Sequence, residues 1–234
     1  MAHTREWKEG DKTMVFIPFP RANSQEAINS TLGTTKSDEH GWNRFKVTDY
    51  GRSWFSKFTA DDVFCADDKD RLEKLRQLKG AHDMLYLRGH CSAGQHQLTS
   101  PDRKLNILAD QIVAYLSENE GLSTDFKGII KVYSCRSGAD YSIFWNAYVW
   151  ESFAQRFADA MFDKGYRSCH FFGYTAKVST WAEAKDLMGR YRKRAVDDNY
   201  NPIGSPTEFR KEFIPRKVNS GPVPKHTPAL LGER

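Results

Sequence analysis

The sequence lacks most of the features that mark specialised classes of protein. Its 234 residues include only four cysteines, which form neither a CxxC pair nor a zinc-ribbon spacing. No apolar run approaches the length needed to span a bilayer, and the first ten residues are charged rather than apolar. We therefore expect free thiols, no membrane span and a chain made in the cytoplasm. Delivery outside the cell by a dedicated secretion system stays open, because such a signal leaves no comparable pattern.

Nucleotide, nucleic-acid and metal sites also lack support in the sequence. No GxGxxG or Walker loop is present. The 35 Lys and Arg residues are offset by 30 Asp and Glu, so we expect no nucleic-acid partner. Residues 65–71 match the Cys-x5-Arg spacing of tyrosine phosphatases, but three Asp residues in that loop would repel a phosphate. The spacing of His90, Cys91 and His96 matches no standard zinc set, and we expect no metal.

What the chain does have is enough apolar residues for one core, in alternating strand and helix patterns. Hydrophobic residues make up 39% of the sequence, including 15 Phe. Apolar runs of strand length lie at 13–19, 84–87, 128–133 and 169–174, and helical patterns lie at 68–79, 106–119, 148–163 and 180–198. This alternation predicts an α/β fold, a three-layer sandwich with a mainly parallel sheet flanked by helices.

The same patterns predict how the chain is divided. We expect one domain over residues 1–198. Within it, the polar stretch 21–40 has the composition of an exposed loop or arm. Residues 199–234 are rich in Pro, Gly and charge, which is typical of an extended tail.

Two of the expected strands end in a small residue followed by a reactive side chain. One leads into Gly89 and His90, and the other leads into Ser134 and Cys135. In parallel sheets, chemistry sits beyond the carboxyl ends of the strands, and neighbouring strands lie about 4.8 Å apart. A thiol becomes a good nucleophile when a base lies beside it. We therefore predict Cys135 as the nucleophile and His90 as the general acid–base.

The neighbours of this pair supply the other parts of a site for acyl chemistry. The backbone N–H groups of Cys91 and Cys135 are the natural donors to an oxyanion. Several residues around the pair let the chain bend and shape the site: Gly89, Ser134, Arg136 and Gly138.

The remaining candidates are interpreted as structural. We expect Cys65 and Cys169 to be core or incidental thiols, and His170 to be a buried histidine inside an apolar strand. No Asp or Glu stands out as a third, orienting group for His90.

The two motifs resemble those of clan CD (caspase-like) cysteine peptidases. The segments are LYLRGHCSAG, residues 85–94, and IKVYSCRSG, residues 130–138. They most resemble the self-processing cysteine protease domains of bacterial RTX toxins and related effector proteases, which carry Gly-His-Gly and Gly-Cys-Ser-like blocks. Cys91, Ser134 and Arg136 depart from that pattern. The strand ending FFGYT also resembles the strand after the cysteine in those domains, and the resemblance covers residues 84–175.

The resemblance implies a caspase-like fold and an endopeptidase that works through a Cys-His dyad and a thioester. It also implies a toxin or effector that acts on protein or peptide substrates, including its own chain in autoprocessing. The toxin domains are activated by inositol hexakisphosphate, so a basic run becomes a candidate polyanion site: Arg190, Arg192, Lys193 and Arg194. Two alternatives stay open, namely a non-catalytic caspase-like binding module and a thiol-dependent acyl-transfer effector.

Overall fold

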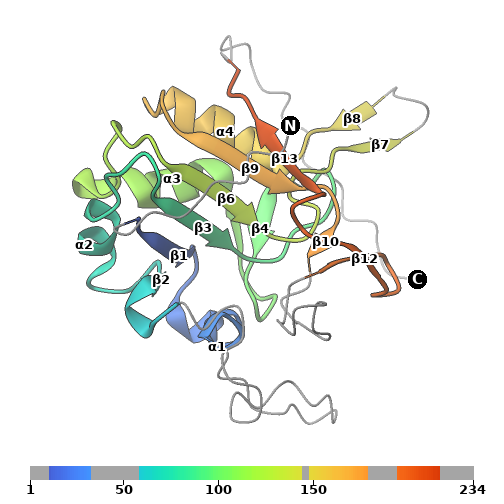
Figure 1. Ribbon diagram of the computed structural model, residues 1–234, viewed down its shortest axis with the longest axis horizontal. Helices are drawn as coiled ribbons and strands as arrows, with labels where there is room; N and C mark the ends of the chain where they lie inside the picture. The colour runs from blue at the N-terminus through green and yellow to red at the C-terminus, as the bar shows by residue number, and fades with distance from the viewer. Residues whose placement is uncertain (1–10, 33–57, 144–147, 179–193, 217–234) are drawn as a thin grey trace.

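A mixed six-stranded sheet forms the centre of the protein (Figure 1). The computed structural model describes residues 11–32, 58–143, 148–178 and 194–216. The strands of the sheet are β1 (Thr13–Ile17), β2 (Val63–Cys65), β3 (Met84–Arg88), β6 (Ile129–Tyr133), β9 (His170–Tyr174) and β13 (Arg210–Phe213). Their order is β13-β9-β6-β3-β1-β2. Five strands are parallel and β13 runs antiparallel to β9, which confirms the predicted mainly parallel sheet.

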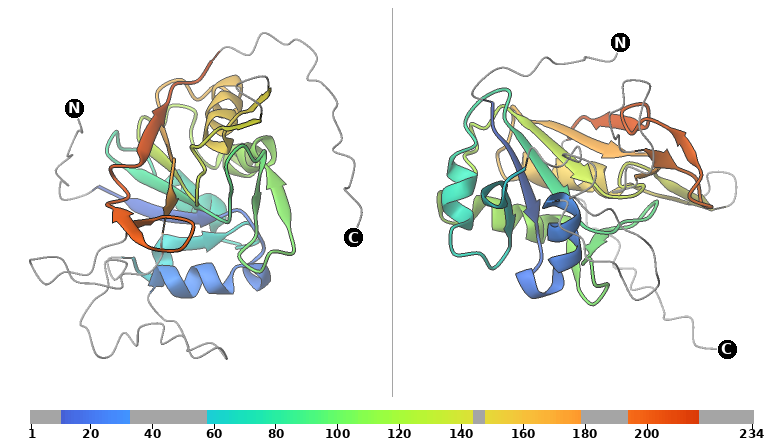
Figure 2. Two further views of the ribbon diagram at one scale, coloured as in Figure 1. Left: turned by 90° about the vertical axis from the view of Figure 1, so that its right-hand side faces the viewer. Right: turned by 60° about the horizontal axis from the view of Figure 1, so that its bottom comes forward.

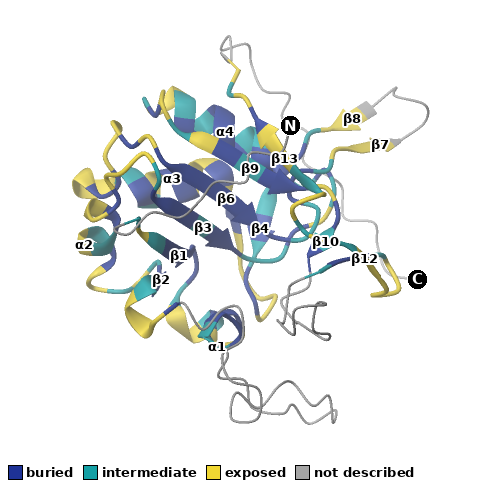
Figure 3. Cartoon of the chain, viewed as in Figure 1, coloured by how far each residue is buried: buried dark blue, intermediate teal, exposed yellow. Residues whose placement is uncertain are grey.

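The central strands are buried on both sides (Figure 3), as expected where layers cover both faces of a parallel sheet. All five residues of β6 are buried, and so are Leu85 and Leu87 of β3. Leu85 pairs with Ile130, and Leu87 pairs with Val132. Because side chains alternate along a strand, these four lie on one face of the sheet.

Helices lie on both faces of the sheet, which gives three layers (Figure 2). The helices are α1 (Gln25–Leu32), α2 (Arg71–Arg76), α3 (Ala109–Ser117) and α4 (Phe153–Asp163). On α4, Phe153, Phe157 and Met161 recur every four residues and are fully buried, so they form one apolar stripe. The ring of Phe157 meets that of Phe171 of β9 edge-on at 6.0 Å, which seats α4 against the sheet.

Small elements cluster around the loops that follow the central strands. They are the hairpin of β4 (Gln97–Thr99) and β5 (Asn106–Leu108), the hairpin of β7 (Tyr141–Ile143) and β8 (Tyr148–Trp150), and a sheet of β10 (Lys177–Val178), β11 (Ala195–Val196) and β12 (Pro202–Gly204). Short 3₁₀ turns complete the set: η1 (Arg21–Asn23), η3 (Ala60–Asp62) and η4 (Glu118–Glu120).

The prediction of a loop or arm over 21–40 is wrong for its first part. Residues 25–32 form α1, and Ala27, Ile28, Ser30 and Thr31 are buried there. Ser30 and Thr31 donate hydrogen bonds from their hydroxyls to the carbonyl of Ala27, which satisfies polar groups in a buried helix face. Residues 33–40 lie outside the described part of the chain.

Three predicted helices have different boundaries in the structure. The segments 106–108 and 148–150 are strands β5 and β8, so helices α3 and α4 begin three and five residues later than predicted. Helix α2 covers only residues 71–76 of the predicted 68–79. Most of the predicted helix 180–198 lies outside the described residues, but its end is wrong, because residues 195–196 form β11.

The expectation of an extended tail after 199 also fails for part of its length. Arg210–Phe213 is strand β13, which pairs with Phe171–Tyr174 along the edge of the main sheet. Most of its side chains are at least partly exposed, so the backbone ladder rather than an apolar pattern places it. Among the described residues, no helix has the length and apolar character needed to cross a membrane.

We expect Gly173→Ala to destabilise the protein, because Gly173 is where β9 and α4 approach most closely. A Cβ at residue 173 would lie 2.6 Å from the Cβ of Ala154 and 3.0 Å from the Cα of Gly138. Overpacking of this kind costs about 1–3 kcal/mol, which urea unfolding would measure. In an Ala154→Gly background the cost should shrink, since the nearest atom is gone. Equal costs in both backgrounds would contradict this account of the packing.

Candidate active site

His90 and Cys135 lie at matching places beyond two adjacent parallel strands. Strands β3 and β6 pair in register over their whole length, and the last pair is Arg88 with Tyr133. His90 and Cys135 each follow two residues later along their own strands. Neighbouring strands are separated by about 4.8 Å. The sheet therefore brings the two predicted side chains to the same edge, on neighbouring strands at its centre. Both residues are partly exposed.

The chain after His90 folds back and holds the imidazole ring. His90 and Thr99 form an isolated antiparallel bridge, with N–H to carbonyl distances of 2.8 and 2.9 Å. The Nε2 atom of His90 lies 3.2 Å from the carbonyl oxygen of Pro101. A carbonyl can only accept a hydrogen bond, so Nε2 carries a proton and donates it. In the neutral ring, Nδ1 is then the basic atom.

The chain after Cys135 makes a tight turn that departs from ordinary backbone geometry. Ser137 donates its N–H to the carbonyl of Ser134 at 3.3 Å. Within this turn, Arg136 has a φ of 52°, in the left-handed region that L-residues seldom occupy. The N–H of Arg136 donates to Ala176, and its guanidinium binds both carboxylate oxygens of Asp198 at 2.7 and 2.8 Å. These contacts tie the turn to the small sheet of β10, β11 and β12.

The thiol of Cys135 points toward the same small sheet. Its Sγ donates to the carbonyl oxygen of Val178 at 3.7 Å. The side chain also packs against Tyr133, Tyr174 and Val178, which form a small buried cluster. The thiol of Cys135 is thus flanked by aromatic rings on the sheet and by the start of β10.

A direct hydrogen bond joins the loop after His90 to the loop after Cys135. Gly94 donates its N–H to the carbonyl of Ala139 at 2.9 Å. Gly94 has a φ of +67°, and a Cβ there would lie 2.5 Å from the Cβ of Tyr141. Only glycine fits both the backbone angle and this space. The two loops are therefore fixed relative to each other as well as to their strands.

The two predicted oxyanion donors are free to act in this arrangement. The N–H groups of Cys91 and Cys135 donate to no acceptor among the described residues. Their neighbours do: Ser92 donates to Gln95, and Arg136 donates to Ala176. The role of the N–H groups of Cys91 and Cys135 in stabilising a developing negative charge stays a prediction.

Burial makes three of the four cysteines poor candidates for a nucleophile. It raises the pKa of Cys65 to about 11, and that of Cys91 and Cys169 to about 12. Cys65 is fully buried, and Cys91 is 7% exposed. As thiolates are the reactive form, these three side chains are poor nucleophiles at neutral pH.

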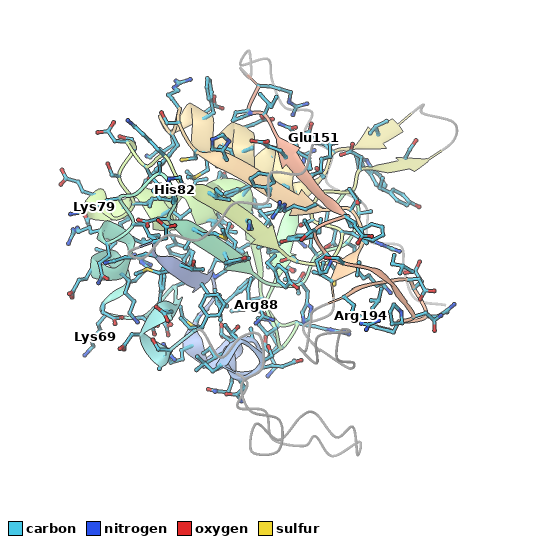
Figure 4. The ribbon with its side chains drawn as sticks, viewed as in Figure 1. Lys69, Lys79, His82, Arg88, Glu151 and Arg194 are labelled. Carbon is cyan, nitrogen blue, oxygen red and sulfur yellow. The ribbon has the colours of Figure 1, made fainter. Side chains whose placement is uncertain are left out.

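A buried cation lies beside the site. Arg88 precedes His90 by two residues, its side chain is buried, and it reaches toward α1 (Figure 4). It donates to the carbonyl of Ala27 at 3.0 Å and to the hydroxyl of Thr31. Burial lowers the pKa of Arg88 to about 10, against the opposing effects of Tyr133, Glu26 and Cys135. Arg88 therefore remains charged at neutral pH.

The other site-shaping residues are placed around the turn. Gly138 packs directly on the backbone of Gly173, and Gly89 packs against Thr99 and Phe19. Ser134 is 2% exposed, and its hydroxyl has no hydrogen-bond partner in the described part of the chain. All of the predicted site-shaping residues thus lie in the two loops that follow β3 and β6.

Several other sequence predictions fare differently. His170 is exposed and binds Glu212 at 2.8 Å, so its interpretation as a core histidine is wrong. In the loop that matches the phosphatase spacing, the carboxylate of Asp68 accepts a hydrogen bond from the backbone N–H of Cys65 at 2.8 Å. In the candidate polyanion run, Arg190, Arg192 and Lys193 lie outside the described residues.

The structure adds two groups to the site that the sequence analysis did not predict. The carbonyl of Pro101 is a backbone atom eleven residues from His90, and no residue type marks it. Arg88 had a weak signal, since it is a charged residue at the end of an otherwise apolar strand. Within the described ranges, no group of three or more His, Cys, Asp or Glu side chains could hold a metal ion.

Comparison with known proteins adds no relative. No protein-family model matches the chain, and a search of curated proteins finds no similar sequence. The resemblance to caspase-like peptidases thus rests on the two sequence motifs.

Alkylation should separate Cys135 from the other three cysteines. With iodoacetamide at pH 7, we expect native protein to be labelled first at Cys135, because it is partly exposed while burial raises the pKa of the other three thiols. Cys65, Cys91 and Cys169 should react only after denaturation, since burial holds them protonated. Peptide mass spectrometry reads each site. Equally fast labelling of Cys91 would show that this description of the site is wrong.

Proposed function

We propose that the protein is a cysteine endopeptidase of the caspase-like type, with Cys135 as nucleophile and His90 as general acid–base. The observation that carries the proposal is the register of β3 and β6, which sets the two side chains beyond adjacent strands at the same sheet edge. The order of the motifs, the strand context and the free N–H groups at residues 91 and 135 support it further.

The reaction follows from these groups. Proton transfer from the Cys135 thiol to Nδ1 of His90 replaces the hydrogen bond to Val178 and leaves a thiolate. The sulfur attacks the scissile carbonyl carbon, and the oxyanion receives the N–H groups of Cys91 and Cys135. His90 then gives the proton to the leaving amine, and a thioester remains on Cys135. Water deprotonated by His90 hydrolyses the thioester and releases the acid.

The Pro101 carbonyl has a defined part in this scheme. It holds the proton on Nε2 throughout, so that Nδ1 alone exchanges a proton with the thiol and the amine. A positively charged imidazole also donates more strongly to a carbonyl than a neutral one. This contact therefore stabilises the ion pair that forms before attack.

The substrate class is protein or peptide, and the chain itself is a candidate substrate. A toxin or effector with autoprocessing remains part of the proposal, with inositol hexakisphosphate as a candidate activator. The competing accounts are a non-catalytic binding module and an acyl-transfer effector, and both make different predictions in the experiment below.

The chain offers matched controls for testing the dyad. Protein should be incubated with a peptide library and with its own inactive chain, with and without inositol hexakisphosphate, and new N-termini read by mass spectrometry. Cys135→Ala and His90→Ala should each lose about 10³-fold or more in cleavage rate, as expected for nucleophile and base. The controls are Cys169→Ala and His170→Ala, which lie at the start of β9 and so at the sheet edge away from Cys135. Both should cleave like wild type.

Each rival would give a distinct result. New acyl adducts without new N-termini would favour transfer over hydrolysis. Absence of both, together with no labelling of Cys135 by peptide electrophiles, would favour a binding module. A His90→Ala variant that cleaves as fast as wild type would refute the dyad itself.

A further inference from the structure

The carbonyl that holds His90 belongs to a turn closed around one buried serine. Ser100 is fully buried and directly precedes Pro101. Its hydroxyl donates to Asp102 Oδ1 at 2.6 Å and accepts the N–H groups of Lys104 and Leu105 at 3.1 and 2.9 Å. Its backbone N–H donates to Leu105 at 2.8 Å. Because so many bonds converge on Ser100, the direction of the Pro101 carbonyl is set by this turn.

Asp102 links the turn to a distant part of the chain. Its second oxygen, Oδ2, accepts a hydrogen bond from the Nδ2 of Asn23 at 2.8 Å. Asn23 ends η1, directly before α1, and Figure 2 shows the β4–β5 hairpin reaching toward that helix. The contact spans 79 residues of sequence, and it is the point at which the turn meets the segment after β1.

The same segment also holds the strand on the other side of His90. Arg88 of β3 donates to the carbonyl of Ala27 and to the hydroxyl of Thr31, both in α1. The η1–α1 segment therefore touches the chain two residues before His90 and again beside the carbonyl that orients its ring. Movement of α1 would be transmitted to the imidazole from both directions.

We propose that Asn23, Asp102 and Ser100 form a positioning network that sets the orientation of His90 through the carbonyl of Pro101. The inference rests on the proposed function, because it assigns these residues a role in the same Cys-His chemistry. None of the three touches the reacting atoms. Their role is to couple the geometry of the imidazole to the η1–α1 segment, 67 residues upstream of His90 in the case of Asn23.

The charge state of Asp102 supports the direction of each hydrogen bond. Hydrogen bonds from Ser100 and Asn23 lower the pKa of Asp102 below its ordinary value. The group is therefore a carboxylate at neutral pH, and both of its oxygens act as acceptors. This fixes the Asn23 side chain as a donor, with a polarity that can be reversed by substitution.

Reversing the polarity of the Asn23–Asp102 bond tests the network. In Asp102→Asn, the amide oxygen still accepts from Ser100, but the carboxylate charge is lost and the Asn23 amide must turn over before its oxygen can accept from the new NH2 group. In Asn23→Asp, two carboxylates face each other. The double variant Asn23→Asp/Asp102→Asn restores a donor opposite an acceptor, and it keeps the net charge of the wild type. Asp110→Asn, an exposed carboxylate at the start of α3, controls for the loss of one charge.

The readout is the rate of alkylation of Cys135 by iodoacetamide as a function of pH, measured by mass spectrometry on the full chain. Each single variant should slow the reaction at neutral pH about 5-fold or more and shift its pH profile toward that of His90→Ala. The double variant should return to within about 2-fold of wild type. Thermal unfolding should change little in any of them, because Asp102 is exposed.

The outcomes separate this inference from the proposed function. If His90→Ala slows alkylation but the single variants behave like Asp110→Asn, the network is refuted while the dyad stands. Slow single variants that the double variant fails to restore would also refute it, since the bond itself would then not carry the effect. A His90→Ala protein that alkylates like wild type would refute the dyad, and the network with it.

Discussion

The in-register pairing of β3 with β6 is the constraint on which the rest of the site depends. A strand advances about 3.3 Å per residue and alternates its side chains between faces. A slip of one residue would therefore move Cys135 along the edge and turn it to the opposite face from His90. The register is held by buried pairs from Met84–Ile129 to Arg88–Tyr133. The positions of His90 and Cys135 at the sheet edge thus depend on packing in the middle of the sheet.

The central strands, and the placement of His90 and Cys135 beyond two of them, were predictable because their signals are local. Each of these strands is a short, mostly buried apolar run, and a reactive residue after such a run lands at a sheet edge. Helix α1 was missed because its buried face is small and polar, with Ser30 and Thr31 bonded to their own helix. Strand β13 was missed because a backbone ladder places it while several of its side chains face solvent.

Within the site, the parts that escaped prediction depend on contacts between distant segments. The Pro101 carbonyl reaches His90 only because residues 91–98 fold back into the bridge with Thr99. Arg88 of β3 donates a hydrogen bond to the carbonyl of Ala27 in α1. Arg136 binds Asp198, which lies 62 residues further along the chain. The chemistry of a side chain follows from its residue type, which the sequence states directly. A backbone carbonyl or an ion pair acquires a role only when tertiary structure brings its partner close. Prediction therefore named the candidate side chains and missed the contacts that hold them.

The turn at 134–138, which carries Cys135, combines several conformational and packing costs. Arg136 stands in the left-handed region, where glycine or asparagine would relieve strain of about 1–3 kcal/mol. The buried hydroxyl of Ser134 has no partner among the described residues, although alanine would fit the same space. The backbone of Gly138 packs directly against that of Gly173, which leaves little room for a side chain at residue 138. Conflicts between local preference and fold tend to gather where function demands them. Three such conflicts fall within this one turn, as we expect if Cys135 has the proposed catalytic role.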